Sequence, residues 1–267
     1  MENAMHMLDH PGWDTTGVSP TRAMRTPDGA WLLTASGEAR LLAGSGDAPP
    51  VDVYDPAMLN GAALPPRLAD ALAALGPVRR WRNTDLWDAL ATAIIRQVIR
   101  AGQARRIHHA FRAAAGDPAG ATGLMPTPER VVSMTAEEFG ALGMAFKRRP
   151  LQAAAAAYLD HYAEWAQLPA DVLVKALQAV PRIGPWTAGA AVADHTGDYS
   201  LYPYADLAVR TWAATADPHT AWPADEPGFA AKWRTLAGPH LSTLTALTLA
   251  WGDRHVRNPP PTGASPR

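Results

Sequence analysis

Cysteine is absent from the sequence. Its absence excludes disulfide bonds, thiolate zinc sites and iron–sulfur clusters held by cysteine, and it fits an intracellular protein. The sequence also lacks a run of about 20 apolar residues, the length that a membrane-spanning helix needs. Residues 1–14 contain no basic segment followed by an apolar one, so we expect no signal peptide. No internal repeat of solenoid length is present.

The chain has no excess of basic charge either, since its formal net charge is −1. Taken over the whole chain, this value argues against a nucleic-acid partner. The charges are unevenly distributed, however, because residues 79–112 contain eight arginines against Asp85 and Asp88, and residues 147–149 are all basic. Such a pattern is typical either of a phosphate-binding surface or of a solvated helix face.

The composition that remains is that of a soluble globular protein, with 48% hydrophobic and 18% charged residues. A chain of 267 residues can form one large or two small domains. In residues 1–78, alternating apolar residues and turn formers predict a small mixed α/β domain. We expect a loose leader over residues 1–20, then strands at 21–26, 30–34, 38–42 and 51–54, and a helix at 65–75.

Residues 79–255 are expected to form a helical domain, so the predicted fold class is mainly α. Thr84 or Asp85 is suited to cap the first long helix. Thr135 and Glu138 have the spacing of a capping box. Further helices are predicted at about 102–115, from 128, at 147–165, 171–179, 185–195 and 206–216, and in two segments of 229–254. Residues 256–267 are expected to be a disordered tail.

Residues 180–188, Val-Pro-Arg-Ile-Gly-Pro-Trp-Thr-Ala, predict a tight hairpin between two helices. Gly184 is expected to allow the sharp turn. Pro185 suits the first position of the second helix, because its missing N–H would have no partner there. The free N–H groups of that first turn carry the positive end of the helix dipole, so they can bind a phosphate without a charged side chain. An ordinary packing unit of two helices is the alternative interpretation.

A single carboxylate, Asp206, stands at the predicted start of the next helix, twenty-two residues after Gly184. Aspartate is a common N-cap, and a helix N-terminus also favours the ionised carboxylate. An anion beside deoxyribose would stabilise the positive charge that develops when the bond between base and sugar breaks. It can also orient or deprotonate an attacking water. Asp206 is therefore interpreted as a helix cap or as a catalytic group, and the two roles are compatible.

Together, the hairpin and Asp206 resemble the helix-hairpin-helix (HhH-GPD) superfamily of DNA glycosylases, which remove damaged bases. The likeness covers residues 79–255, and residues 1–78 correspond by analogy to the small N-terminal domain of AlkA-type 3-methyladenine DNA glycosylases II. The resemblance implies a monomeric enzyme of the bacterial cytoplasm and nucleoid that acts on double-stranded DNA and leaves an abasic site. It implies no organic cofactor, and a monovalent cation, Na⁺ or K⁺, at the hairpin backbone near Val180 and Ile183.

The same resemblance assigns roles to individual residues, with Asp206 as the invariant catalytic aspartate. Members that also cut the sugar–phosphate chain carry a lysine nucleophile where this chain has Trp186. Because the chain's only lysines are Lys147, Lys175 and Lys232, the resemblance implies a monofunctional glycosylase. The implied base pocket contains Trp186, Trp251 and Tyr204, and the implied DNA-binding residues are Arg182, Ile183, Gly184, Trp186 and Thr187 of the hairpin and Arg96, Gln97, Val98 and Arg100.

Residues 93–100 resemble the family segment that fills the gap left by a flipped base. Val98 is the expected wedge and Ile99 the alternative, whereas burial of both in a helix is the non-functional interpretation. Arg182 stands where the family usually has glycine, which predicts a left-handed non-glycine residue or a different local path. His108 and His109 are expected at the surface.

An aromatic pocket suits a cationic alkylated base such as 3-methyladenine or 7-methylguanine, through stacking and cation–π attraction. Three alternatives stay open. The first is a glycosylase for oxidised, deaminated or bulky adducted bases. The second is a lesion-binding protein without catalytic activity, and the third is a basic segment that docks a partner protein.

Overall fold

The computed structural model describes residues 5–121 and 123–257. The chain forms two compact units, which are described separately. The terminal unit comprises residues 1–9, 52–80 and 204–267, and the central unit comprises residues 10–51 and 81–203. The expected boundary near residue 78 therefore does not separate the units, because residues 10–51 belong to the same unit as the central helices.

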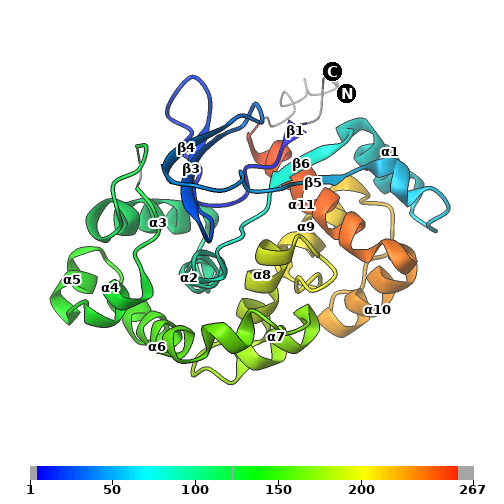
Figure 1. The fold of residues 1–267 in the computed structure, drawn as a ribbon. Helices are drawn as coiled ribbons and strands as arrows, with labels where there is room; N and C mark the ends of the chain where they lie inside the picture. The colour runs from blue at the N-terminus through cyan, green and yellow to red at the C-terminus, as the bar shows by residue number, and fades with distance from the viewer. Residues whose placement is uncertain (1–4, 122, 258–267) are drawn as a thin grey trace, which may run out of the picture. The chain divides into compact units, whose positions relative to one another are not determined.

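The terminal unit combines a small sheet with helices. Its sheet has the order β1-β6-β5, and β1 runs parallel to β6. Helix α11, at the red end of the chain in Figure 1, packs against α1, α9 and α10 around buried side chains such as Leu68, Phe229 and Leu247. The elements are β1 (Met5–His6), β5 (Val51–Tyr54), η1 (Pro56–Leu59), α1 (Pro66–Leu75), β6 (Val78–Trp81), α9 (Leu207–Ala216), α10 (Glu226–Ala237), η3 (Gly238–His240) and α11 (Leu241–Arg257).

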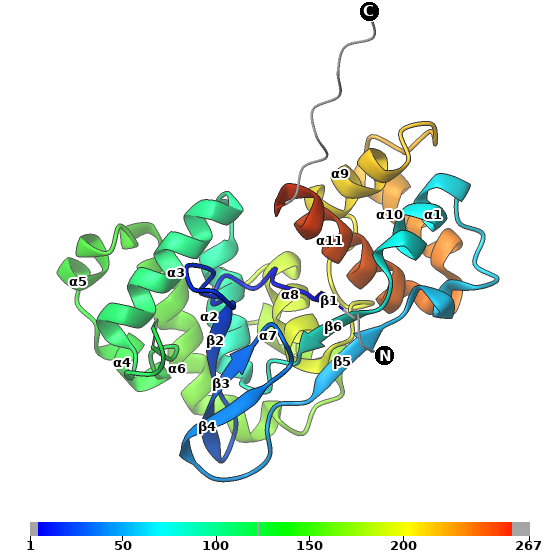
Figure 2. The same cartoon turned by 90° about the horizontal axis from the view of Figure 1, so that it is seen from above.

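The central unit combines an antiparallel meander, β2-β3-β4, with helices. Helix α2 is buried along its length and lies side by side with α8 (Figures 1 and 2). The elements are β2 (Thr21–Arg25), β3 (Gly29–Thr34), β4 (Ala39–Gly44), α2 (Leu86–Arg96), α3 (Ala101–Ala115), α4 (Pro128–Ser133), α5 (Ala136–Ala141), η2 (Ala145–Lys147), α6 (Arg148–Trp165), α7 (Ala170–Gln178) and α8 (Pro185–Thr196).

Buried arginines attach residues 10–51 to the central helices. Arg112 of α3 donates to Gly12 O at 3.2 Å, to Ala23 O at 2.7 Å and to Gly123 O. Arg22 of β2 pairs with Asp88 of α2 at 3.2 Å. Removing a charged group from water costs free energy unless hydrogen-bond or ion-pair partners surround it. These bonds therefore explain why the meander belongs to the helical unit.

The expectation of a loose leader is wrong for residues 5–20, and residues 1–4 lie outside the described part of the chain. Met7 and Trp13 are buried, and Asp14 forms a β-bridge with Thr21. Strand β1 pairs with β6 over only two residues, so it is too short to show a periodic pattern in the sequence. Sequence analysis missed β6 for a similar reason, because its four residues include two arginines.

Several caps confirm the sequence-based expectations. Asp85 accepts hydrogen bonds from the N–H groups of Trp87 and Asp88 at the start of α2. Thr135 and Glu138 form the predicted capping box of α5. The predicted break between α10 and α11 falls at residues 238–240. Helix α11 continues through residues 256–257, and residues 258–267 of the expected tail lie outside the described residues. Within the described part of the chain, no helix has the length and apolarity needed to cross a membrane.

Candidate functional site

The hairpin predicted at residues 180–188 joins α7 to α8. Helix α7 buries Leu173 and Leu177, and α8 begins at Pro185 without a side-chain cap at Gly184. The first intrahelical bond of α8 runs from the N–H of Ala188 to Gly184 O at 3.1 Å. The N–H groups of Trp186 and Thr187 precede this bond and have no partner within the helix, so they can donate hydrogen bonds to a phosphate.

The sharp turn of the hairpin lies at Arg182 and not at Gly184. Arg182 has a φ of 70°, which confirms the expected left-handed conformation without glycine. Gly184 has a φ of −85°, an ordinary extended value, so the expectation that Gly184 provides the turn is wrong. A Cβ at Gly184 would meet nothing within 4 Å. Packing does not require glycine there, and its missing side chain leaves the start of α8 open to a ligand.

The predicted wedge is an exposed turn after α2. The helix ends at Arg96, and Val98 follows with a φ of 59° and a fully exposed side chain. Positive φ is rare for a β-branched residue, so this backbone is strained. Ile99 is partly buried. The side chain of Val98 therefore projects into solvent, and the interpretation of Val98 as a buried helix residue is wrong.

Gln97 connects this turn to the hairpin. Its Nε2 donates to Thr187 Oγ1 at 2.5 Å and to Arg182 O at 3.3 Å. Two of the predicted DNA-binding segments thus lie in direct contact within the central unit. Arg96 and Arg100 flank the turn, and Arg100 is exposed just before α3.

Lys147 holds the same turn from beneath. Its Nζ donates to Ile94 O and to Gln97 O, both at 2.7 Å, and the residue is only 3% exposed. Burial lowers the pKa of Lys147 to about 8. Phe146, which is 55% exposed, precedes it. Sequence analysis counted Lys147 in a basic surface run, and no local pattern indicated that its partner was 50 residues away.

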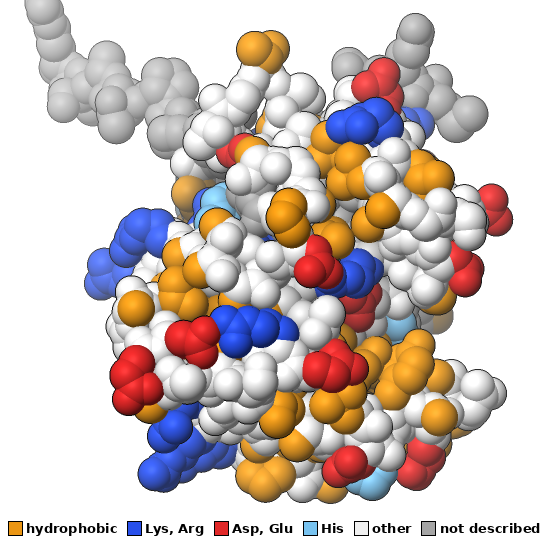
Figure 3. Space-filling view, turned by 60° about the vertical axis from the view of Figure 1, so that its left-hand side comes forward, with side chains coloured by type: hydrophobic (Ala, Val, Ile, Leu, Met, Phe, Trp, Pro, Cys, Tyr) orange, Lys and Arg blue, Asp and Glu red, His pale blue; other side chains and the backbone are white. Residues whose placement is uncertain are grey.

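The eight arginines of residues 79–112 do not form one basic surface. Arg80 and Arg112 are buried, Arg80 beside Asp9 at 3.4 Å, and Arg105 donates to Trp13 O at 2.9 Å. Arg100 and Arg106 are exposed. Figure 3 shows acidic and basic side chains interspersed on one face of the molecule. A phosphate ligand would therefore have to be bound by individual arginines and backbone N–H groups.

Asp206 lies in the terminal unit, directly before α9. It is half-buried and occupies the N-cap position, but its side chain makes no capping bond to the first turn of α9. The carboxylate is thus not used to cap this helix, contrary to one interpretation of the sequence. Tyr204, two residues earlier, is also partly buried.

Trp251 of α11 belongs to an aromatic cluster in the same unit. Its ring stacks on His255, with centroids 4.9 Å apart, and contacts Trp212 of α9 edge-on at 6.5 Å. A Cβ at Gly252 would overlap the Trp212 indole, so this close packing of α9 on α11 requires glycine. Sequence analysis missed Trp212 and His255, although an isolated glycine inside a helix is a signal of close approach.

A buried polar cluster in the central unit has the composition of a metal site but not its electrostatics. Ligand atoms of His10, Asp88 and His108 lie within 4.8 Å of one another. Arg22 already pairs with Asp88. Burial, together with Arg112 and Arg22, holds the pKa of His108 well below its usual range. Two neighbouring guanidinium groups disfavour a bound cation, so we interpret this cluster as a structural network.

His108 is fully buried, so the expectation that it lies at the surface is wrong, whereas His109 is partly exposed.

A monovalent cation was expected at the hairpin backbone, near Val180 and Ile183. Val180 O accepts the N–H of Ile183 at 3.1 Å, and a carbonyl oxygen retains a second lone pair for a ligand.

Searches with the sequence found no matching protein-family model and no matching curated protein. Solved structures do match. The 8-oxoguanine glycosylase/lyase of Clostridium acetobutylicum, bound to DNA with cytosine opposite 8-oxoguanine, has a TM-score of 0.68 at 15% identity and covers 94% of this chain and 90% of that one. For the 3-methyladenine DNA glycosylase of Archaeoglobus fulgidus, the TM-score is 0.66 at 16% identity, covering 92% and 91%. The 3-methyladenine DNA glycosylase of Schizosaccharomyces pombe, bound to abasic DNA, has a TM-score of 0.54 at 20% identity, covering 73% and 87%.

These likenesses show the fold. The chain has the mainly α fold of the helix-hairpin-helix DNA glycosylases, as the sequence predicted.

Proposed function

We propose that this protein is a monofunctional DNA glycosylase that rotates an alkylated base out of duplex DNA and hydrolyses its N-glycosyl bond. The observation that carries the proposal is the contact between the Val98 turn and the hairpin through Gln97. An exposed apolar side chain in a strained, supported backbone is suited to replace a flipped base. The open N-terminus of α8 beside it is suited to hold the DNA backbone.

DNA binds through backbone N–H groups and a few arginines. The N–H groups of Trp186 and Thr187 donate hydrogen bonds to one phosphate, and Arg182, exposed in the hairpin, contacts the DNA backbone nearby. Arg96 and Arg100 contact phosphates on either side of Val98. Few charged contacts are needed, because the helix dipole contributes at α8, and this is compatible with a net charge of −1.

Asp206 provides the chemistry. Its carboxylate stabilises the oxocarbenium-like sugar electrostatically and orients the water that attacks the anomeric carbon. The bond to the base breaks, the cationic base leaves as a neutral molecule, the attacking water gives its proton to the Asp206 carboxylate, and an abasic site remains. Two features support this role, namely the correspondence with the family aspartate and the absence of a capping bond from the Asp206 side chain to α9.

The family resemblance assigns three aromatic residues, Trp186, Trp251 and Tyr204, to the recognition of the base. Electron-rich rings attract a cationic alkylated base more strongly than a neutral one. The similar structures include glycosylases named for 8-oxoguanine as well as for 3-methyladenine. An oxidised base is therefore the second candidate substrate, and excision assays distinguish the two classes.

A lyase reaction is not expected. Trp186 occupies the position of the family's lysine nucleophile. Lys147 is engaged by two carbonyl groups, and Lys232 donates to Ala221 O at 2.8 Å. A lysine nucleophile needs an accessible, neutral amine. Of the three lysines only Lys175 is exposed, and it lies on α7, away in sequence from the position of Trp186. We propose a monomeric enzyme that uses no organic cofactor and binds Na⁺ or K⁺ at the Val180 and Ile183 carbonyls.

The test is base release from duplexes that each carry one lesion, by wild type and Asp206→Asn, read before and after alkali. We expect release of 3-methyladenine or 7-methylguanine that falls at least 1000-fold in Asp206→Asn, with strand breaks only after alkali. Lesion binding should be retained by the variant. Strand breaks before alkali would contradict the monofunctional reaction. Tight lesion binding without any base release would identify a lesion-binding protein instead.

A further inference from the structure

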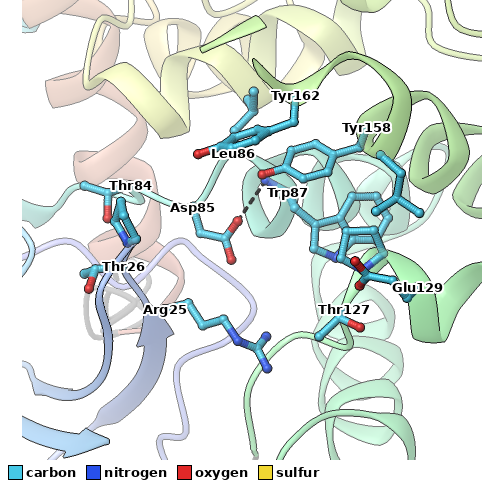
Figure 4. Close-up of a pocket in the computed structure, with 13 residues that line it drawn as sticks. Arg25, Thr26, Thr84, Asp85, Leu86, Trp87, Thr127, Glu129, Tyr158 and Tyr162 are labelled. Atoms are coloured by element: carbon cyan, nitrogen blue, oxygen red, sulfur yellow. Dashed lines mark hydrogen bonds between the residues drawn. The ribbon is translucent and has the colours of Figure 1, made fainter. Parts of the chain in front are cut away.

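A cavity lies in the central unit, at the N-terminal end of α2 (Figure 4). Its volume is about 370 Å³. The Val98 turn follows the other end of the same helix, and eleven residues of helix separate the two by about 16 Å. The cavity is therefore distinct from the proposed DNA-binding site. It is lined by Arg25, Thr26, Pro27, Thr84, Asp85, Leu86, Trp87, Thr127, Pro128, Glu129, Tyr158, Leu159 and Tyr162.

Asp85 is the half-buried carboxylate of this cavity. One of its oxygens accepts the N–H groups of Trp87 at 2.9 Å and Asp88 at 3.2 Å. Burial, followed by the charge of Asp88, raises the pKa of Asp85 to about 6, although Arg25 and the two N–H groups oppose the rise. Asp85 forms no salt bridge with any other described residue. Its charge is therefore not compensated by an ion pair.

Arg25, the one basic residue among those that line the cavity, is already engaged elsewhere. Its guanidinium donates to Met125 O at 2.5 Å and pairs with Asp117. A second carboxylate, Glu129, also lines the cavity. With Arg25 paired, the remaining charge of the lining is negative.

Aromatic rings form one wall. The ring centroids of Tyr158 and Tyr162, both on α6, lie 4.9 Å apart, and the ring centroid of Trp87 lies 5.8 Å from that of Tyr158. Figure 4 shows both tyrosine hydroxyl groups on the side where Asp85 lies. Burial and the charge of Asp85 raise the pKa of Tyr158 above its usual range, so the phenol stays neutral. Leu159 and Tyr162 are each 44% exposed, which gives the cavity an apolar rim.

We infer that this cavity binds a primary alkylammonium group, with the ammonium at the Asp85 carboxylate and the methylene chain along Leu159 and the adjacent prolines. A carboxylate and aromatic faces together are the usual surroundings of an organic cation in proteins. An anion is disfavoured, because Asp85 itself accepts the first free N–H groups of α2. Pro27 and Pro128 complete the apolar lining.

The experiment is calorimetric titration of the full-length protein with n-butylammonium at pH 7.5. We expect saturable binding with a dissociation constant on the order of 1 mM. n-Butanol, which keeps the four-carbon chain without the charge, should bind at least tenfold more weakly. Asp85→Asn, in which asparagine still caps α2, should also weaken butylammonium binding at least tenfold.

Tyr162→Ala should weaken binding about threefold by removing one ring, and its exposed site makes unfolding a minor risk. Glu137→Gln, at a carboxylate outside the cavity, is the matched control and should bind like wild type. Equal binding by wild type and Asp85→Asn would overturn the proposal, as would equal binding of butylammonium and butanol. Base release by Asp85→Asn should equal that of wild type, so failure here is distinguishable from failure of the glycosylase proposal.

Two sources can supply an alkylammonium group, and two further titrants separate them. Nα-acetyl-lysine methylamide represents a lysine side chain of a partner protein, and putrescine represents a free diamine. Binding of the blocked lysine at least as tight as that of butylammonium supports a protein lysine. Tighter binding of putrescine supports the diamine, and binding of neither titrant nor butylammonium overturns the proposal.

Discussion

Helix α2 is capped by a charged side chain at each end, and the two caps differ in origin. At the N-terminus, Asp85 accepts hydrogen bonds from the N–H groups of Trp87 and Asp88, the second and third residues of the helix. At the C-terminus, Lys147 donates to Ile94 O and Gln97 O from fifty residues further along the chain. Both charges match the helix dipole. The first cap is local and forms with the helix, whereas the second requires that η2, which contains Lys147, already lies beside the end of α2.

The two ends also differ in backbone strain. Asp85 has ordinary extended dihedral angles, while Val98 has a positive φ. A left-handed conformation costs about 1–2 kcal/mol for a residue with a side chain, and two charge-assisted hydrogen bonds from a buried lysine are enough to offset it. A strained turn that is both exposed and rigidly supported is typical of a functional site. This difference supports the two proposals, which place DNA contact at the C-terminal end of α2 and alkylammonium binding at its N-terminal end.

The largest effect is expected from Lys147→Met. The substitution keeps the length of the side chain but removes the charged donor from Gln97 O and from Ile94 O, which keeps only the N–H of Gln97 at 3.3 Å, so the free energy of unfolding should fall by about 2–3 kcal/mol. Base release should fall roughly 100-fold, because the Val98 turn is no longer held in place. Urea unfolding and single-turnover excision measure the two effects. Lys175→Met, at an exposed lysine, is the control. Full activity in Lys147→Met would break the proposed link between this cap and the wedge.

Smaller effects are expected from Val98→Gly, and here stability and activity should change in opposite directions. Glycine relieves the strain at positive φ, so the protein should become more stable by about 0.5–1 kcal/mol. Base release should nevertheless fall about tenfold, since the side chain that replaces the flipped base is missing. Thermal unfolding and excision assays are sufficient. Val98→Ala retains a Cβ and should lose activity without gaining stability, and unchanged activity in both variants would exclude Val98 as the wedge.

The smallest effect on base release is expected at the N-terminal end of α2, where Asp85 lies. The pKa of Asp85 is raised from 3.8 to about 6 in the folded protein. Between pH 4 and 6 the folded chain therefore holds a proton that the unfolded chain has released, and the contribution of Asp85 to stability decreases as pH rises through this window. The stability of Asp85→Asn relative to wild type should increase by on the order of 1 kcal/mol from pH 4 to pH 7.5. Base release should not change.

A difference between the two proteins that is independent of pH would show that Asp85 is not perturbed in this way. Butylammonium binding provides a second readout of the same group. It should be about tenfold weaker at pH 5 than at pH 7.5, because the carboxyl is then mostly protonated. Asp88, Glu129 and Arg25 are the other charged groups near Asp85, with Tyr158 and Tyr162 across the cavity.

Features that depend on neighbouring residues were predictable from the sequence. The Asp85 cap, the Thr135–Glu138 capping box, the hairpin helices and the break at Gly238 each arise from side chains within four residues of the backbone they affect. The site features of this kind, the open start of α8 and the position of Asp206 before α9, were likewise predicted.

Features that depend on distant partners were not predictable in this way. Arg112 and His108 carry no sign of burial in the sequence, because their partners are contributed by residues 10–23 and by α2. Lys147 was interpreted as a surface charge for the same reason. Gly184 illustrates a different error, since a glycine at a turn need not be the residue that turns. There, Arg182 adopts the unusual dihedral angles.

Strand β1 has a practical consequence for shortened versions of this chain. It places a third strand beside β6, and the N–H of Met7 donates to Arg79 O at 2.8 Å. Without residues 5–7, β6 would become an edge strand of its sheet. Its unpaired N–H and C=O groups could then pair with strands of other molecules. Trimming the first residues would therefore promote self-association and precipitation, although these residues lie far in sequence from the hairpin and from Asp206.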